Sequence, residues 1–407
     1  MSDRPPRVAH LVSHPIQYFA PLYRELASRP EIDLTVYFYS DASARAYVDA
    51  EFGRSVTWDT SLLDGYRSKF LPSAARTDLS TRMLKQPNWD IICEVASGRF
   101  DALWVHGYAH ATTWLAAAAA RARGMCVLIR DEQTLLHGRP SHKRALKQAA
   151  LRALYSQASA LYIGEQNRRY FAHYGMPAER MFPAPYCVDN RYFRGMAATL
   201  RPRRCEMRAR FGINGDAPVV MFSGKLIDKK QPLMLIEAFA RVRARQSCWL
   251  LIAGDGALRT AAEDLVERLG VPDVRIAGFL DQRELPVAYA AADIFVLPSN
   301  LHETWGLVVN EAMNFALPVI VSDKVGCAED LARPGENGFV VAHESVAALS
   351  DAIARLVSDA PLRAAFGAES QRIVEQYSIE ACADGIVAAC LAGEGRRTAW
   401  KQEALAS

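Results

Sequence analysis

The sequence lacks the cysteine pattern of disulfide-bonded proteins and the long apolar runs of membrane-spanning ones. Its eight cysteines are dispersed and none forms a C-x-x-C pair, which favours free thiols in a reducing compartment over disulfides or a zinc site. The most apolar run, residues 114–120, is far shorter than the roughly 20 residues that cross a bilayer. The N-terminus passes from Arg4-Pro5-Pro6 directly into an apolar segment, so no signal peptide is expected. These absences predict a cytoplasmic protein.

A complete G-x-G-x-x-G fingerprint is also missing after the first predicted strand, which disfavours an NAD-dependent oxidoreductase. Half of the 407 residues are hydrophobic and 23% are charged. This composition excludes a disordered chain, a collagen-like chain and a coiled-coil fibre. The length predicts two domains, since one domain typically takes roughly 100–200 residues.

Short apolar runs alternate along the chain with longer amphipathic segments. In the first half, strands are predicted at 7–13, 33–39, 102–106, 126–130 and 160–163, and helices at 18–29, 111–123, 141–155 and 165–174. In the second half, strands are predicted at 219–222, 249–253, 274–276, 294–297 and 319–321, and helices at 232–245, 258–269, 284–292 and 307–315. Continuous apolar strands separated by helices are typical of parallel sheets covered on both faces, so each half is predicted to be a doubly wound α/β domain.

The domain boundary is expected within residues 183–204, where prolines, Gly195 and three arginines interrupt the pattern. We place the first domain at 1–195 and the second at 196–376, with a C-terminal helix at about 377–407 packing back on the first. The two halves differ in charge. Residues 1–200 carry 25 basic and 18 acidic side chains, whereas residues 201–407 carry 23 and 27.

Two loops of the second half begin with glycine after a predicted strand. Gly224-Lys225 is followed by Lys230, so one loop brings two cations to a helix N-terminus and suits a diphosphate; a solvated basic loop is the equal alternative. The second loop, Gly254-Asp255-Gly256, has Arg259 where a dinucleotide fingerprint needs its third glycine. It indicates only a tight strand-to-helix turn.

A third strand end carries the most informative segment. Glu303 lies in the loop after a strand, and Glu311 follows eight positions later inside the next predicted helix. The amides of Trp305, Gly306 and Leu307 would open that helix and present N–H donors to an anion. A carboxylate such as Glu311 would bind vicinal hydroxyls, as acidic residues do for ribose. One segment thus offers sugar, phosphate and ribose contacts together.

These three motifs, in this order at strand ends, resemble the donor-binding half of the family-4 glycosyltransferases, closely over residues 215–340. The resemblance implies a retaining enzyme of GT-B architecture, with two Rossmann-like domains facing a central cleft and a nucleoside diphosphate sugar as donor. It implies that Lys225 and Lys230 hold the diphosphate, that Glu303 contacts the transferred sugar, and that Ala277-Gly278-Phe279-Leu280 lies against the nucleobase. The positions so predicted to line the donor site are Gly224, Gly254, Phe279, Leu280, Thr304, Trp305, Gly306, Leu307 and Glu311.

The resemblance also implies that neither a metal nor a cofactor is used. No Asp-x-Asp pair occurs in the chain, so the two lysines and the helix amides would offset the charge of the leaving diphosphate. The acceptor is predicted to be a hydroxyl, such as that of a lipid-linked glycan, and the departing diphosphate would help to take its proton.

The first half departs from the family pattern at two strand ends. The loop after the first strand lacks the glycine pair common in the family, so His14 and Gln17 are candidates for acceptor or donor contacts, with a structural role for His14 equally favoured. No histidine occurs in Leu128-Ile129-Arg130-Asp131-Glu132-Gln133, where the family commonly has one. We expect Asp131 or Glu132 to meet the acceptor hydroxyl, assisted by Arg130 or by His106 at the preceding strand end.

Five basic residues and no acidic one lie between Gln133 and Gly164. They are Arg139, Lys143, Arg144, Lys147 and Arg152. A solvated helix face is one interpretation of the segment 139–152, and peripheral contact with anionic lipid at the inner face of the membrane is the other. No nucleic-acid partner is predicted, because no aromatic residues interleave with these charges.

The function predicted overall is sugar transfer in polysaccharide or glycolipid assembly by a metal-independent hexosyltransferase. Two alternatives stay open. An epimerase-like enzyme of the same architecture would turn over a sugar nucleotide without an acceptor. A non-catalytic sugar-nucleotide binding protein would bind the donor without transfer or hydrolysis.

Overall fold

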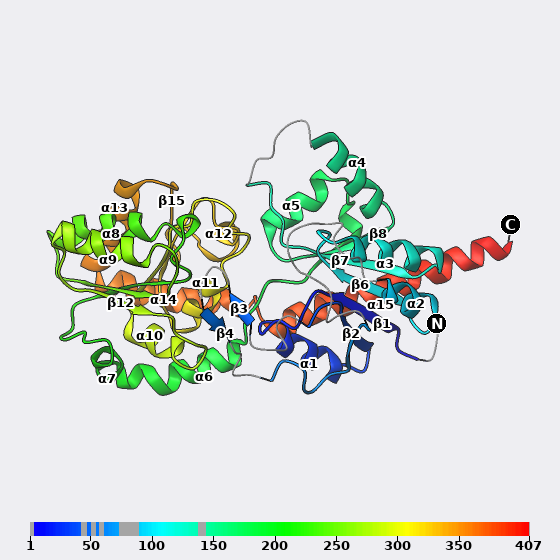
Figure 1. The fold of residues 1–407 in the computed structure, drawn as a ribbon, viewed down its shortest axis with the longest axis horizontal. Coiled ribbons are helices and arrows are strands. Elements are labelled where there is room, and N and C mark those ends of the chain that lie inside the picture. Colours follow the sequence, from blue (N-terminus) through cyan, green and yellow to red (C-terminus); the bar gives the residue numbers. More distant parts are fainter. Residues whose placement is uncertain are drawn as a thin grey trace. The chain divides into compact units, whose positions relative to one another are not determined.

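The computed structural model describes residues 4–41, 47–49, 54–56, 61–72, 89–136 and 144–406 (Figure 1). The chain forms two compact units. The first comprises Met1–Tyr47, Val56–Tyr186 and Ile379–Ser407, and the second Val48–Ser55 and Cys187–Ser378. The boundary expected at 195/196 lies inside helix α6 (Asn190–Leu200), which packs within the second unit: the side-chain amide of Asn190 donates to the Val374 carbonyl at 3.0 Å.

The first unit is built on a seven-stranded parallel sheet of order β5-β2-β1-β6-β7-β8-β9. Its strand order reverses between β1 and β6, which makes their carboxyl ends the topological switch point of the sheet. A separate two-stranded sheet pairs β3 with β4. The strands of the seven-stranded sheet are β1 (Arg7–Val12), β2 (Asp33–Phe38), β5 (Ser68–Phe70), β6 (Ala102–His106), β7 (Cys126–Arg130), β8 (Ala158–Tyr162) and β9 (Met181–Pro183). The pair β3 (Tyr47–Asp49) and β4 (Arg54–Val56) belongs mostly to the second unit, which includes Val48–Ser55.

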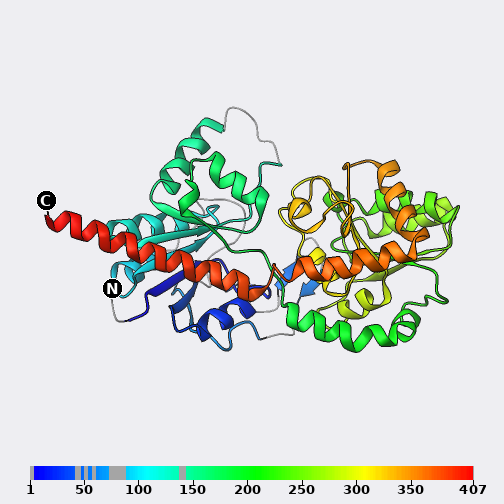
Figure 2. The same cartoon turned by 180° about the vertical axis from the view of Figure 1, so that it is seen from behind.

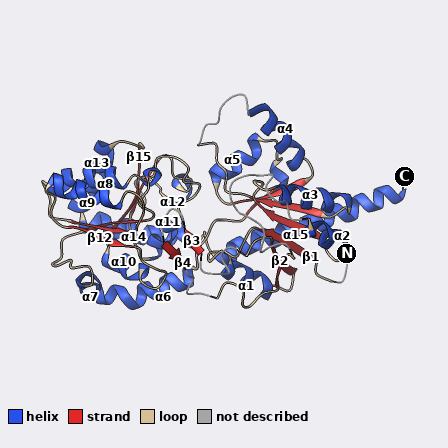
Figure 3. Cartoon of the chain, in the orientation of Figure 1, coloured by secondary structure: helices blue, strands red, loops and turns tan. Residues whose placement is uncertain are grey.

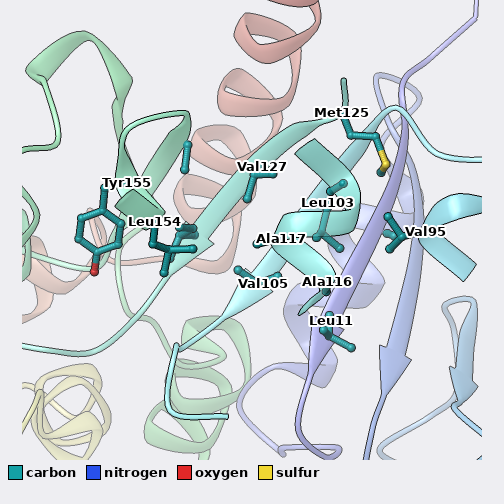
Figure 4. Packing of buried hydrophobic residues seen from close by; sticks show 14 of the residues in the cluster. Leu11, Val95, Leu103, Val105, Ala116, Ala117, Met125, Val127, Leu154 and Tyr155 are labelled. Atoms are coloured by element: carbon teal, nitrogen blue, oxygen red, sulfur yellow. The ribbon is translucent and has the colours of Figure 1, made fainter. Parts of the chain in front are cut away.

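Helices cover both faces of this sheet. On one face, Leu11, Leu103 and Val105 of the strands pack against helices α2 and α3 in a buried apolar cluster (Figure 4). The long C-terminal helix α15 runs along the opposite face beside α1 (Figure 2). The helices are α1 (Ala20–Ser28), α2 (Asp90–Ala96), α3 (Ala111–Ala122), α4 (Arg144–Tyr155), α5 (Glu165–His173), the 3-10 turn η3 (Ala178–Arg180) and α15 (Ile379–Ala406).

The second unit repeats this plan with a six-stranded parallel sheet of order β12-β11-β10-β13-β14-β15. The order reverses between β10 and β13, so their carboxyl ends form its switch point. The strands are β10 (Val219–Ser223), β11 (Trp249–Ala253), β12 (Val274–Gly278), β13 (Ile294–Leu297), β14 (Val319–Ser322) and β15 (Gly338–Val341).

Two layers of helices enclose this second sheet (Figure 3). Helices α8, α9 and α13 pack together on one face, and α6, α7, α10 and α11 on the other. Besides α6, the elements are η4 (Arg201–Arg203), α7 (Arg204–Ala209), η5 (Asp228–Lys230), α8 (Pro232–Arg243), α9 (Arg259–Leu269), α10 (Leu285–Ala291), α11 (Leu307–Asn314), α12 (Ala328–Leu331), α13 (Val346–Ser358) and α14 (Ala360–Val374).

The predicted α/β fold class is confirmed, and every predicted strand is present with its ends within two residues of the expected positions. The prediction missed the edge strands β5, β9 and β15. β5 and β9 are three residues long and only partly buried, so they lack the continuous apolar run that marks the central strands. β15 does carry a short apolar run at 339–341, but it begins at a glycine and is only partly buried. In the described parts of the chain, no helix has the length and hydrophobicity needed to span a bilayer.

Candidate functional site

The switch point of the second unit brings together the two loops that carry Lys230 and Glu303. The Asn300 amide, after β13, donates to the Lys229 carbonyl of η5 at 2.9 Å and ties the loops to each other. The Lys230 ammonium forms an ion pair with Oε2 of Glu303, and both side chains are mostly buried, with 12% and 11% exposed. The Ser299 hydroxyl donates to the same carboxylate oxygen at 3.2 Å. Lys230 and Glu303, predicted to contact the diphosphate and the sugar, therefore belong to one hydrogen-bonded cluster.

Lys225 is half-buried in the same loop, whose backbone is interlocked with the loop after β11. The Gly224 amide donates to the Ala253 carbonyl at 3.0 Å, and the Leu226 amide to the Asp255 carbonyl at 2.8 Å. A Cβ on Gly254 would lie 1.9 Å from the Gly224 carbonyl oxygen, so only glycine permits this approach. The Gly254-Asp255-Gly256 turn thus supports the loop that carries Lys225.

Helix α11 begins next to the Lys230–Glu303 pair. Its N-cap is Gly306, with a φ of +102°, so no N-cap side chain accepts a hydrogen bond from the first amides of the helix. The indole of Trp305 is buried and donates to Asn310 Oδ1 at 2.9 Å, so this side chain packs inside the unit. Unpaired amides at a helix N-terminus favour an anion. The geometry therefore suits a phosphate group bridging Lys230 and this terminus.

Backbone hydrogen bonds from the loop after β14 hold the segment before α11. The Gly326 amide donates to the Glu303 carbonyl at 2.9 Å, and the Cys327 amide to the Trp305 carbonyl at 3.1 Å. A Cβ on Gly326 would lie 1.9 Å from the carbonyl oxygen of Thr304, which is itself half-buried. The loop after β14 therefore fixes the backbone that the sequence predicts as a ligand contact.

Glu311 lies one helical turn after Leu307 and is 1% exposed. The hydroxyl of Tyr289, on α10, donates to its Oε2 at 2.8 Å. Sequence reasoning missed Tyr289, because a tyrosine inside an apolar helix gives no signal beyond burial. Phe279 and Leu280 follow β12 and are half-buried; β12 lies two strands from β10, so this segment is placed at the carboxyl edge of the same sheet.

In the first unit, the loop after β1 places His14 and Gln17 at the switch point between β1 and β6. The Ser13 hydroxyl lies 2.9 Å from His14 Nδ1. Burial lowers the pKa of His14 to about 4, and the nearby His106 and His110 add to the shift, so His14 is neutral at pH 7. Gln17 is half-buried, and its Oε1 atom is enclosed without a hydrogen-bond partner among the described residues.

His106 and Glu132 form a polar pair at the ends of β6 and β7. His106 Nε2 lies 3.5 Å from Glu132 Oε1, to which the Tyr186 hydroxyl donates at 2.7 Å. Burial alone would raise the pKa of Glu132, but His106, Tyr186 and the nearby Arg130 hold it below its ordinary value. Arg130 is buried with its guanidinium over the rings of Phe19 and Tyr186, at 5.3 and 5.2 Å.

Asp131, the neighbouring acidic candidate, is placed differently. It is 2% exposed and accepts hydrogen bonds from the Gln133 amide at 3.0 Å, Asn167 Nδ2 at 2.9 Å and the Tyr155 hydroxyl at 3.1 Å. Burial outweighs these bonds and raises the pKa of Asp131 to about 6. Asp131 therefore holds the loop after β7 to α4 and α5, and Glu132, with 30% of its side chain exposed, is the more accessible carboxylate.

The basic segment is only partly within the described residues. Arg139 and Lys143 lie outside them, and α4 begins at Arg144. Lys147 does not share a solvated basic face, because its ammonium lies over the rings of Tyr108, Tyr170 and Tyr174 at 5.7, 4.9 and 5.1 Å. Leu146 of the same helix is 78% exposed, and Arg152 is exposed as well.

Comparison with known proteins finds similarity to glycosyltransferases. Residues 204–373 match the family model of glycosyl transferases group 1. The chain is 31% identical over 212 residues to the alpha-D-kanosaminyltransferase of Streptomyces kanamyceticus, covering 51% of this chain and 53% of that protein. It is 30% identical over 221 residues to the GDP-mannose-dependent alpha-(1-6)-phosphatidylinositol monomannoside mannosyltransferase of Mycobacterium tuberculosis, covering 52% and 56%. The chain thus spans about half the length of the curated relatives it matches.

Solved structures resemble the whole chain in fold. The crystal structure of Anabaena HepE in complex with UDP and glucose superposes with a TM-score of 0.68 at 17% identity, covering 94% of this chain and 98% of that one. At this identity the likeness shows the fold alone. It confirms the predicted fold class, two Rossmann-like α/β units of the GT-B architecture.

Proposed function

We propose that the chain is a retaining, family-4-type glycosyltransferase that moves a sugar from a nucleoside diphosphate sugar to a hydroxyl acceptor. The observation that carries the proposal is the buried Lys230–Glu303 pair at the β10/β13 switch point, next to the N-terminus of α11. The match of residues 204–373 to glycosyl transferases group 1 supports it.

In this proposal the second unit binds the donor. Lys230 and Lys225 hold the diphosphate together with the amides that open α11, and these positive groups stabilise the charge that develops as the diphosphate leaves. Glu303 hydrogen-bonds a hydroxyl of the transferred sugar, and Glu311 binds the ribose. The charge of the leaving group is met by protein groups, so we propose that no metal or cofactor is needed at this step.

The first unit is proposed to bind the acceptor through His14, Gln17 and the His106–Glu132 pair. The bond between the anomeric carbon and the diphosphate oxygen breaks, and the acceptor oxygen bonds to the same face of that carbon. Because the acceptor oxygen bonds on the face that the diphosphate leaves, the configuration is retained, and the acceptor proton passes to the departing diphosphate. His106 orients the acceptor hydroxyl, and Glu132 and Tyr186 orient His106.

The test is turnover of UDP-, GDP- and ADP-sugars with and without a crude lipid-linked glycan acceptor. We expect one donor to release its nucleoside diphosphate only when an acceptor is present, and the new linkage to keep the anomeric configuration of the donor. The rate should be unchanged by a chelator. Release or isomerisation without an acceptor would favour an epimerase-like enzyme, and donor binding without either would favour a non-catalytic binding protein.

We propose further that the acceptor is lipid-linked and that the segment 139–152 meets an anionic membrane surface. The exposure of Leu146 and Arg152 on α4 supports this, as does the name of the mannosyltransferase relative, which acts on a phosphatidylinositol monomannoside. Each basic residue near such a surface contributes about 1 kcal/mol.

Flotation with liposomes tests the membrane contact. We expect the protein to float with vesicles that contain phosphatidylglycerol but not with pure phosphatidylcholine vesicles, and Leu146→Glu to weaken the anionic binding. Equal, negligible binding to both vesicle types would remove the membrane proposal.

A further inference from the structure

We propose that Tyr289 is a positioning residue for nucleoside recognition, a role that rests on the proposed function. Its hydroxyl fixes the carboxylate of Glu311 in the orientation that binds the ribose hydroxyls of the donor. Tyr289 is buried and its hydroxyl donates to Glu311 Oε2, so in this inference it acts through Glu311.

The position of the tyrosine hydroxyl links it to the donor site. It lies 2.8 Å from Glu311 Oε2 and 3.5 Å from the carbonyl oxygen of Val308, in the first turn of α11. Glu311 is four residues after Leu307, so the two lie on the same face of the helix. A nucleoside whose diphosphate is held by the amides that open α11 would therefore have its ribose within reach of this face.

The surroundings leave the carboxylate few alternative orientations. The ring of Tyr289 packs against Phe295 and Phe315, with ring centroids 6.0 and 5.5 Å apart, so its hydroxyl is fixed in place. The terminal torsion of a glutamate has a broad energy profile, and hydrogen bonds decide its angle. A hydrogen bond to a carboxylate is also stronger than a neutral one. The Tyr289 bond therefore sets how Glu311 presents its oxygens.

Tyr289→Phe removes the hydroxyl and keeps the ring. Calorimetry would measure the binding of UDP or GDP, whichever the wild type binds more tightly, and of its 2′-deoxy and 3′-deoxy analogues. We expect the wild type to prefer the ribonucleotide by about ten-fold or more, because a site that hydrogen-bonds a hydroxyl rejects the analogue that lacks it. In Tyr289→Phe this preference should fall to about two-fold or less, because the Glu311 carboxylate is no longer held toward the ribose. A ten-fold change in affinity corresponds to about 1.4 kcal/mol.

Tyr37→Phe is the matched control. The Tyr37 hydroxyl donates to Glu94 Oε2, also at 2.8 Å, in the first unit, so this variant loses the same kind of bond away from the β10/β13 loops. We expect its ribose preference to match the wild type, and thermal unfolding of both variants would show how much each bond stabilises its unit.

Glu311→Gln separates positioning from a general structural effect. If Tyr289 acts through Glu311, adding Tyr289→Phe to Glu311→Gln should change nucleotide affinity by less than about two-fold, as expected for residues that work as one unit. Two results would overturn this inference alone. One is a ribose preference in Tyr289→Phe equal to that of the wild type. The other is a double variant in which the losses of nucleotide affinity from the two single variants add in full. Failure of the wild type to bind any nucleoside diphosphate would overturn the proposed function as well.

Discussion

Replacing Lys230 with alanine is expected to lower kcat by about 10³-fold, a loss of about 4 kcal/mol of transition-state stabilisation. The ammonium sits at the switch point with 12% of its side chain exposed, where water screens its charge poorly. It would face the diphosphate as negative charge accumulates on the leaving oxygen. Steady-state rates with the preferred donor, measured on folded protein, check the prediction.

Lys229→Ala is the matched control for Lys230. Lys229 lies in the same 3-10 turn, and its carbonyl, which alanine retains, accepts the Asn300 amide that ties the two loops. We expect the control to keep kcat within about three-fold of the wild type, as for a surface substitution with little effect on folding. Similar losses in both variants would mean that the loop, and not the Lys230 charge, limits turnover.

Loss of the Lys230 charge also leaves Glu303 without its ion-pair partner, and breaking such a buried pair is destabilising. The double variant Lys230→Ala/Glu303→Gln removes both charges and should recover most of the lost thermal stability without recovering activity. This outcome would separate the catalytic loss from a folding defect.

Glu303→Gln is the second large effect, with kcat expected to fall by about 10²–10³-fold. The amide keeps the shape of the side chain and retains an oxygen that accepts from Ser299 and Lys230. It loses the negative charge with which Glu303 binds a sugar hydroxyl and responds to positive charge at the anomeric centre. Because the nucleoside diphosphate product carries no sugar, its affinity measured by calorimetry should change by less than about three-fold, even as turnover collapses.

Glu336→Gln provides the control for this substitution. Glu336 lies in the loop before β15, and its side chain is 54% exposed and 3.7 Å from the Arg333 guanidinium. Its replacement should leave kcat unchanged. An active Glu303→Gln enzyme would contradict the proposed contact with the transferred sugar.

The positions of several candidate site residues could be predicted because their signals are local. Gly224, Lys230, Glu303 and Glu311 all follow strand ends that the apolar pattern locates within two residues. The contacts between segments could not be predicted in this way. Tyr289 meets Glu311 from another helix, and no periodicity in either segment indicates the pairing.

In the first unit, prediction from the sequence was limited for a different reason. The sequence placed His106, Asp131 and Glu132 at strand ends but did not decide between the two acidic neighbours. Consecutive residues of an extended chain point to opposite sides, so one carboxylate turned inward to Asn167 and Tyr155 and the other toward His106. Which of the two carboxylates points into the core depends on how α4 and α5 pack, and the strand pattern does not specify that packing.

Edge strands and the segment between the two units were harder still to predict from the sequence. The prolines and arginines of residues 183–204 indicated an interruption, but α6 forms there because the Asp189 side chain caps its N-terminus, accepting from the Tyr192 amide at 2.9 Å. A solvated helix face was one of two interpretations of the segment that holds Lys147, yet its ammonium lies over the ring of Tyr108, after β6, and the rings of Tyr170 and Tyr174, in α5 and at its C-cap.

The most direct test of the donor site is a crystal structure of the protein grown with the nucleoside diphosphate that stabilises it most against heat. We predict that the diphosphate lies at the β10/β13 switch point, with Lys230 Nζ and an amide at the start of α11 within hydrogen-bond reach of its oxygens and the ribose against Glu311. A nucleotide bound at any other place on the second unit, or on the first unit alone, would contradict the account.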